Sequence, residues 1–130
     1  MAAPELGSFS NGTTGNTTIS LNGAGTPVFL EFWAGARSST TESSDIHSVG
    51  FVDIGNAVAA WQSNLAADTL NQTKDGAGAS TGVCFTHYAV VTGAISKRVE
   101  FKFVSVAAGQ FTVNLTAADA NYPIYYKVTY

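Results

Sequence analysis

The end of the chain alternates apolar residues with polar or amphipathic ones at a period of two. The alternation runs through three segments, 99–103, 111–115 and 124–128. Because successive side chains of a β-strand point to opposite faces of a sheet, each segment presents one apolar face and one more polar face. Gly109 and the turn-forming residues 118–121 separate the segments. The sequence therefore predicts three consecutive antiparallel strands, a β-meander.

Segment 99–103 lies within a longer predicted strand, 95–106, and three further segments have the composition of strands, with predicted bounds 27–33, 46–54 and 83–91. The first is the most hydrophobic run of the chain and is apolar on both faces except at Glu31. Such a run indicates a strand that is covered on both sides or that lies beneath a contact between subunits. In the second, Gly50 could mark a β-bulge. The polar residues 37–45 and 74–80 are expected to form loops.

Two parts of the chain are compatible with more than one structure. Residues 1–25 are rich in Gly, Asn, Ser and Thr and carry turn signals at Asn11-Gly12 and Asn22-Gly23, so they fit either a short hairpin or a flexible arm. Residues 57–62 fit a hairpin return strand, but Val58 and Trp61 also have helical spacing behind Asn56, which could be a helix N-cap. The strand is the favoured interpretation, with a loop or a short helical turn after it.

About eight short strands with Gly-centred turns predict an all-β fold, an antiparallel β-sandwich of jelly-roll-like type. A chain of 130 residues suits a single domain that buries about two-thirds of its unfolded surface. We expect this domain to span residues 26–130, with residues 1–25 as the arm or hairpin in front of it.

Charged residues make up only 12% of the chain, against about 25% in an average soluble domain. Fifteen Thr and twelve Ser residues supply the polar surface instead. This composition suits the solvent-facing positions of strands. It equally suits a protein whose faces are covered by copies of itself, because interface cores are depleted of charge.

Charge and hydropathy argue against several classes of partner. The net charge is −3, and Lys97 and Arg98 are the only adjacent cations, so nucleic-acid binding through clustered cations is not expected. No apolar run is long enough for membrane insertion. The first residues lack the charged and apolar regions of a signal peptide; we therefore expect synthesis in the cytoplasm.

No constellation of residues predicts catalysis, a metal site or a cofactor. Asp45, His47 and His87 could supply metal ligands, but the two histidines are forty residues apart in the chain. Cys84 and His87 are three residues apart in a predicted strand and should point to opposite faces, which argues against a nucleophile pair. A buried Cys84 that packs as a small apolar residue is the expected alternative. Turns are the predicted positions of four aspartates, Asp53, Asp68, Asp75 and Asp119.

Aromatic residues are the best candidates for contacts with a glycan or another subunit, and four are selected: Trp33, Trp61, Tyr125 and Tyr130. In the last predicted strand the even-numbered residues from Tyr122 to Tyr130 share one face, and Tyr125 lies on the other with Lys127. We expect the even face to belong to the core and the odd face to meet solvent. The alternative is a contact between protomers.

Several segments together resemble a recurrent module of tailed-bacteriophage virion proteins, found in tail fibres and other surface-exposed structural proteins. They are SFSNGTTGNTTISL (8–21), GTP (25–27), VFLEFWAGA (28–36), SVGF (48–51), FTVNL (111–115) and IYYKV (124–128). The Gly-Phe-x-Pro motif of the family is kept only in part, since Thr26 precedes Pro27 and the Phe is missing. The architecture also resembles the H-type lectins, six-stranded antiparallel sandwiches that form trimers and bind sugars between protomers.

The resemblance implies a non-enzymatic virion protein that is displayed on the particle as a fibre tip or a capsid decoration. We expect a homo-oligomer, with a homotrimer as the expected form, that contacts other virion proteins through residues 1–25. The lectin-like architecture implies an alternative, a carbohydrate-binding module for recognition of the host surface. In that case Trp33, Trp61 or Tyr125 would stack on the sugar, although no position matches a sugar ligand of the lectins.

Overall fold

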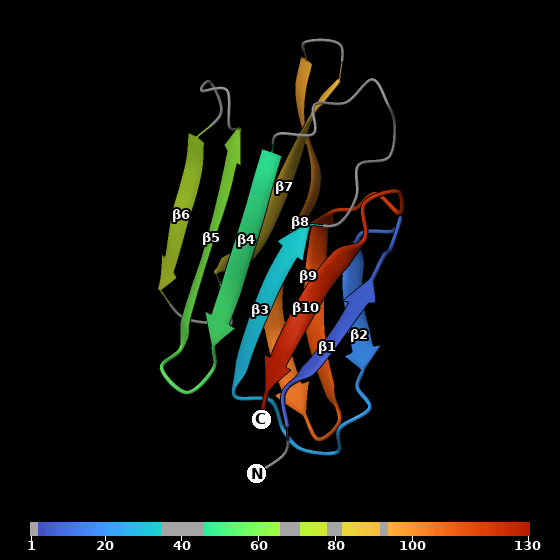
Figure 1. Ribbon diagram of the computed structural model, residues 1–130, viewed down its shortest axis with the longest axis vertical. Coiled ribbons are helices and arrows are strands. Elements are labelled where there is room, and N and C mark those ends of the chain that lie inside the picture. Colours follow the sequence, from blue (N-terminus) through green and yellow to red (C-terminus); the bar gives the residue numbers. More distant parts are fainter. Residues whose placement is uncertain (1–2, 35–45, 66–70, 78–81, 92–93) are drawn as a thin grey trace.

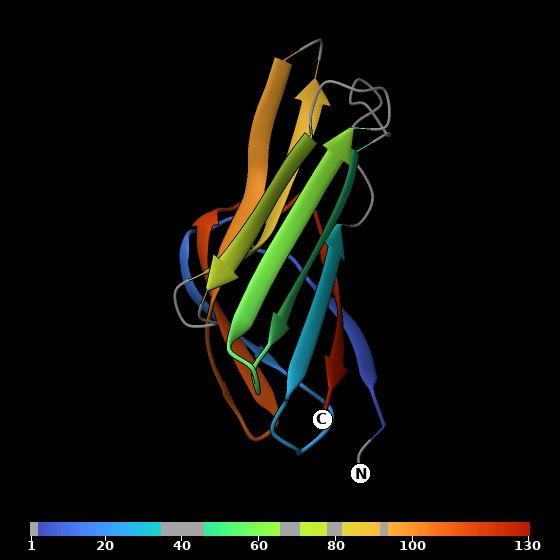
Figure 2. The same cartoon turned by 90° about the vertical axis from the view of Figure 1, so that its left-hand side faces the viewer.

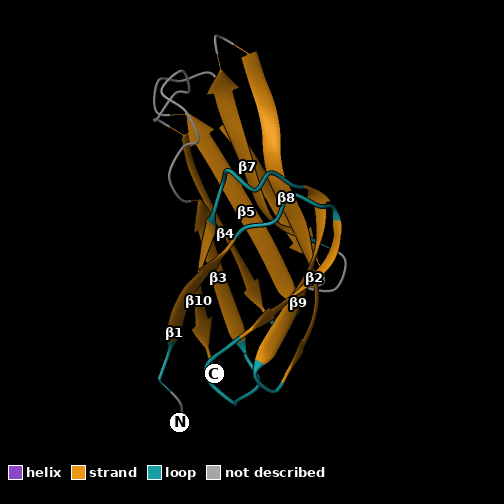
Figure 3. Cartoon of the chain, turned by 90° about the vertical axis from the view of Figure 1, so that its right-hand side faces the viewer, coloured by secondary structure: helices purple, strands orange, loops and turns teal. Residues whose placement is uncertain are grey.

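The computed structural model describes residues 3–34, 46–65, 71–77, 82–91 and 94–130. Every regular element in this part of the chain is a β-strand (Figure 3). Their bounds are β1 Glu5–Phe9, β2 Gly15–Ser20, β3 Phe29–Ala34, β4 Ile46–Asp53, β5 Val58–Leu65, β6 Asn71–Ala77, β7 Val83–Val91, β8 Ala94–Ala107, β9 Gln110–Ala117 and β10 Ile124–Thr129.

The strands form two antiparallel sheets that pack face to face (Figure 1, Figure 2). Sheet A has six strands in the order β1-β10-β3-β4-β5-β6, and sheet B has four in the order β2-β9-β8-β7. This arrangement confirms the predicted all-β antiparallel sandwich. The first and last strands lie side by side in sheet A, so both termini emerge at the same end of the molecule (Figure 1).

Aromatic rings from both sheets fill the core. Phe32 of β3 packs edge-on against Phe101 of β8, with ring centroids 4.9 Å apart, and also contacts Phe85 and Phe111 of sheet B. Phe32 is 1% exposed and Phe101 is fully buried. Edge-to-face aromatic pairs add roughly 0.5–1.5 kcal/mol each beyond the area they bury, so this cluster helps to hold the two sheets together.

The predicted C-terminal meander is only partly correct. β8 and β9 form a hairpin whose turn uses Gly109 with a left-handed φ of 72°, a conformation that glycine adopts at little cost. β10 does not continue that sheet. It crosses to sheet A and pairs between β1 and β3. Its even-numbered residues do face the core as predicted, since Ile124, Tyr126 and Val128 are at most 5% exposed.

The N-terminal residues do not form the expected hairpin or free arm. β1 pairs with β10 in sheet A, whereas β2 pairs with β9 in sheet B. The two strands therefore lie in different layers of the sandwich, and each is an edge strand of its sheet. The described part of residues 1–25 is therefore integral to the sandwich, and the boundary expected near residue 26 has no counterpart in the strand pairing.

The favoured interpretation of residues 57–62 is confirmed, because they lie largely within strand β5. The loop expected at 74–80 is wrong where the structure describes it, since residues 74–77 belong to β6 and pair with β5. Hydrogen bonding to β5 holds this polar, Gly-containing segment in an extended conformation as an edge strand. The loop expected at 37–45 lies outside the described residues.

Gly50 does not form a bulge, because β4 pairs with β3 and β5 in continuous register through it. Its role is to admit the main chain of β7, which packs across β4 and β5. A Cβ atom at position 50 would lie 1.8 Å from the carbonyl oxygen of Cys84. No side chain fits at that distance, so glycine is required by the close approach of two backbones.

Glu5 joins the two ends of the chain to the loop that follows β2. Its carboxylate accepts hydrogen bonds from the amides of Asn22 (2.9 Å) and Gly23 (2.8 Å) and from the Tyr130 hydroxyl (2.9 Å). Desolvation opposes ionisation of Glu5, but these hydrogen bonds outweigh it and lower the pKa of the carboxyl group. Partial burial and the bond to Glu5 raise the pKa of Tyr130 to about 12.

Replacing Gly50 with alanine is expected to lower the free energy of unfolding by roughly 1–3 kcal/mol or more, because the added methyl group overlaps the β7 backbone. Gly55→Ala is the matched control. Gly55 lies in an exposed turn, where the atom nearest to the added Cβ, Asp53 Oδ1, is 3.7 Å away. Urea unfolding measures both variants, and equal stabilities would contradict the close packing of β4 on β7.

The free energy of unfolding should depend on pH in both the acid and the alkaline range, because titration of Glu5 or of Tyr130 breaks the contacts between them. Because the folded-state pKa of Glu5 is lowered, its contribution is present above its ordinary value of 4.5 and is lost as the pH falls further. The raised pKa of Tyr130 means that its contribution is lost as the pH rises from about 10 to about 12.

Urea unfolding as a function of pH tests this coupling. Glu5→Gln should be less stable than the unmodified chain at neutral pH, with the difference shrinking in acid. Tyr130→Phe should remove the alkaline loss that is due to this hydroxyl. A gap between Glu5→Gln and the unmodified chain that stays constant down to about pH 3 would refute a stabilising role of the ionised carboxylate.

Candidate functional site

The outer surface of sheet B is polar, and its side chains satisfy one another. Thr18 pairs with Thr112 (2.8 Å) and Asn114 donates to Asn16 (2.7 Å) across β2 and β9. On β8, Glu100 binds Lys97 in an ion pair of 2.9 Å and accepts hydrogen bonds from Thr116 and Thr86. These bonds leave few unsatisfied groups, so this face is well adapted to water.

The outer face of sheet A is very different, because apolar and aromatic side chains occupy most of it. Its members are Leu6 on β1, Tyr125 on β10, Phe29 and Trp33 on β3, Val49 and Phe51 on β4, and Val58 and Ala60 on β5. Leu6 is 69% exposed and Val49 51%. Scattered apolar residues on a surface need no explanation, but contiguous ones across five strands indicate a binding surface.

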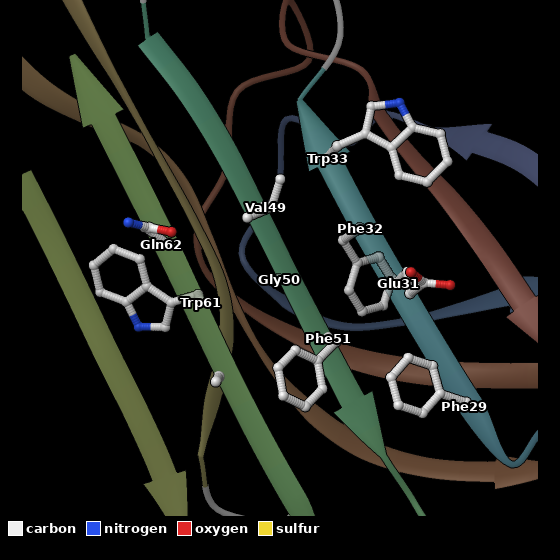
Figure 4. Close-up of a pocket in the computed structure, with 10 residues that line it drawn as sticks. Phe29, Glu31, Phe32, Trp33, Val49, Gly50, Phe51, Trp61 and Gln62 are labelled. Atoms are coloured by element: carbon white, nitrogen blue, oxygen red, sulfur yellow. The ribbon is translucent and has the colours of Figure 1, made fainter. Parts of the chain in front are cut away.

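A shallow groove of about 510 Å³ runs over β3, β4 and β5 on this face (Figure 4). Phe29, Trp33, Phe51 and Val49 line it, and Gln62 lies at its β5 side. Phe32 and Gly50 belong to the inward-facing row of their strands, so their main chains form the floor. The groove is therefore a depression in the sheet surface that lies between the outward-facing side chains of β3, β4 and β5.

Aromatic rings lie in pairs along the groove. Phe29 and Phe51, diagonal neighbours on β3 and β4, have nearly parallel rings, with an interplanar angle of 6° and centroids 5.6 Å apart. Figure 4 shows both rings side by side with their faces towards the viewer. Trp33 and Tyr125 form a second pair, with centroids 6.2 Å apart and an angle of 22°. Flat aromatic surfaces of this kind suit stacking on sugar rings or on the aromatic residues of a protein.

Two opposite charges lie in the middle of this apolar surface. Glu31 and Lys127 are direct register partners on β3 and β10, and both are partly buried. Neither takes part in an ion pair within the described part of the chain, where the two ion pairs are Lys97–Glu100 and Arg98–Asp119. On the outer face of sheet A a carboxylate and an ammonium group therefore lie side by side, and neither belongs to an ion pair among the described residues.

The four predicted contact residues do not form one site. Trp33 and Tyr125 come together on the outer face of sheet A, 37% and 39% exposed. Trp61 occupies the inward-facing row of β5 and is only 9% exposed, and it also lines the groove together with Trp33. Tyr130 is held by Glu5 near the chain ends. Sequence reasoning missed Leu6, Phe29, Val49 and Phe51, although the spacing of Phe29, Glu31 and Trp33 already places those three on one strand face.

A buried serine–histidine pair joins the two sheets. Ser48 Oγ lies 2.7 Å from His87 Nδ1 and 2.8 Å from Ser63 Oγ, and the His87 ring packs against Tyr122. Ser48 is 3% exposed, Ser63 fully buried and His87 7% exposed. A nucleophile must meet its substrate. At this burial the pair acts as a satisfied polar link inside the sandwich.

The other residues considered for chemistry have structural environments where the structure describes them. Cys84 is fully buried, its thiol donates to the Phe101 carbonyl oxygen at 3.6 Å, and burial raises its pKa. Asp53 binds the amide and side chain of Asn56 in the turn after β4, and Asp119 binds the amide of Asn121. Among the described residues no group of three or more His, Cys, Asp or Glu side chains could hold a metal ion.

Comparisons with known proteins add no family assignment. Within the described residues no helix is long and apolar enough to cross a membrane. No protein-family model, no curated protein and no solved structure matches the chain. The fold and the surfaces of this chain are therefore the basis of the functional argument, and the phage and lectin resemblances stay predictions.

Proposed function

We propose that this chain is a non-enzymatic structural protein of a tailed-phage virion, displayed on the particle as a homo-oligomeric fibre tip or capsid decoration. The observation that carries the proposal is the contrast between the two outer faces of the sandwich. One is polar and satisfied, whereas the other presents aromatic rings and available charges. Water hydrates the second face poorly, and covering it with protein is favourable.

The low content of charged residues, 12%, supports assembly for the same reason. Cores of protein interfaces are depleted of charge and enriched in aromatic residues, and the outer face of sheet A has that composition. The burial of the Ser48–His87 pair supports a non-enzymatic role. β1 and β2 are held in the sheets, so contacts with other virion proteins are proposed to use the faces of the sandwich.

Light scattering coupled to size-exclusion chromatography tests the homo-oligomer. We expect the mass to rise with concentration to a multiple of 13.5 kDa, because exposed apolar surface is removed from water on association. The expected trimer gives three times that mass, and a dimer gives twice. A monomer at every concentration up to the millimolar range would refute the oligomer, while mass spectrometry of purified virions tests the location.

The second candidate function is carbohydrate binding at the host surface, and the Trp33–Tyr125 pair favours it. The two rings are nearly parallel and exposed, and Glu31, Lys127 and Gln62 lie nearby as hydrogen-bonding groups. A sugar can stack its apolar face on such rings while polar groups bind its hydroxyls.

A glycan array separates this candidate from a purely architectural role. If a sugar binds, Trp33→Ala should abolish the signal, because it removes half of the aromatic pair. Tyr88→Ala on sheet B, whose ring lies near Lys97, is the control and should leave binding unchanged. Trp61→Ala is unsuitable, since truncating a buried Trp costs roughly 3–5 kcal/mol of stability. An array without signal would eliminate carbohydrate binding for the glycans tested.

A further inference from the structure

The side chains on the outer face of sheet A form three rows across its strands, set by the hydrogen-bonded register. The first row contains Ser8, Tyr125, Trp33, Val49 and Gln62; the second contains Leu6, Lys127, Glu31, Phe51 and Ala60; the third contains Thr129, Phe29, Asp53 and Val58. The charge pair of Glu31 and Lys127 thus lies in the middle row, and aromatic residues lie on both sides of it.

This charge pair restricts what can cover the face. Burying a charge without a partner is costly, and removing one member of a buried ion pair is strongly destabilising because the other charge is left unpaired. A purely apolar partner would leave Glu31 and Lys127 with only each other as compensation. A suitable partner must offer a cation opposite Glu31 and an anion opposite Lys127, about one strand spacing apart, within an apolar surround. The same face of a second copy has this arrangement.

We propose that the outer face of sheet A docks on the same face of a second copy around a two-fold axis that runs along the strands, between β3 and β10. Such an axis brings β3 of each protomer over β10 of the other, so that Glu31 of each copy faces Lys127 of its partner. This inference rests on the proposed homo-oligomeric function and specifies its interface as isologous, with each patch binding itself. It makes a dimer, in place of the expected trimer, the unit of assembly.

The same operation makes further pairs that fit. Trp33 of one copy meets Tyr125 of the other, which places two aromatic residues in contact across the interface. Because β1 is carried over β4, Leu6 faces Phe51 of the second copy, and this contact covers the most exposed large apolar side chain among the described residues, at 69%. Two face-packed sheets can align in this way within the usual angle of about 30°.

The size of the contact sets its strength. Four strands about 4.8 Å apart and three rows about 7 Å apart cover roughly 400 Å² of each copy. The total of roughly 800 Å² is below the roughly 1,200 Å² of the smallest stable interfaces and belongs to weak, transient contacts. We therefore expect reversible association, with a dissociation constant in the micromolar range or above. On a virion, many tethered copies raise the effective concentration.

Charge reversal tests the interface by sedimentation velocity over a concentration series. Glu31→Lys and Lys127→Glu should each weaken self-association at least about tenfold, because like charges then face each other across the axis. Lys102→Glu, the same charge change on the exposed outer face of sheet B, is the matched control and should leave association unchanged. Circular dichroism of each variant checks that the strands are retained.

Mixing the two single variants gives the decisive result. In the mixed dimer the lysine at position 31 of one copy faces the glutamate at position 127 of the other, and the remaining two positions pair in the same way. Association should therefore return to within about threefold of the unmodified protein. If Glu31 and Lys127 interacted only within one chain, mixing the two variants would not restore association.

The outcomes distinguish this inference from the proposed function. A homo-oligomer whose strength is unaffected by the reversals, or a trimer not restored by mixing, would overturn the two-fold interface and leave the oligomeric virion protein standing. A monomer at all concentrations would overturn both. A monomer that binds a glycan and loses it with Trp33→Ala would assign the face to a sugar.

Discussion

The packing of Phe32 against Phe101 is the contact on which the rest of the structure depends. Once Phe32 points into the core, strand alternation sends Glu31 and Trp33 to the outside of sheet A. β10 and β4 pair with β3 in register, so the same choice also decides which of their side chains face outward. The unusual outer face of sheet A is thus a direct consequence of how the two sheets are joined.

The outer faces of the two sheets differ in how their polar and charged side chains are paired. Sheet B satisfies its polar groups through side-chain hydrogen bonds and an ion pair, as Glu100 shows with Lys97 and Thr116. Sheet A leaves Glu31 and Lys127 without ion-pair partners among the described residues and surrounds them with apolar groups. A lone sandwich gains nothing from this arrangement. The proposed assembly gives it a physical purpose, because a second copy supplies both missing charges.

The joining of the chain ends adds the first strand to this face of sheet A. Glu5 ties β1 to the loop after β2 and to Tyr130, and the first strand completes the edge of sheet A beside β10. Because β1 is held in place, Leu6 becomes part of the apolar surface. The residues expected to act as a tether therefore extend the proposed interface.

The sequence alone determined the period-two pattern, hence the all-β sandwich, the strand at residues 57–62 and the inward even face of β10, because alternation is a local property of each strand. Which strands pair was decided only by the tertiary structure: β10 left the predicted meander, and β1 and β2 went to different sheets. The strand pairing also decided that Trp61 points inward and Trp33 outward. An alternating strand pattern does not say which of two apolar faces will be covered. Gly50 shows the same limit, because its need for glycine arises from Cys84 on a strand more than thirty residues away.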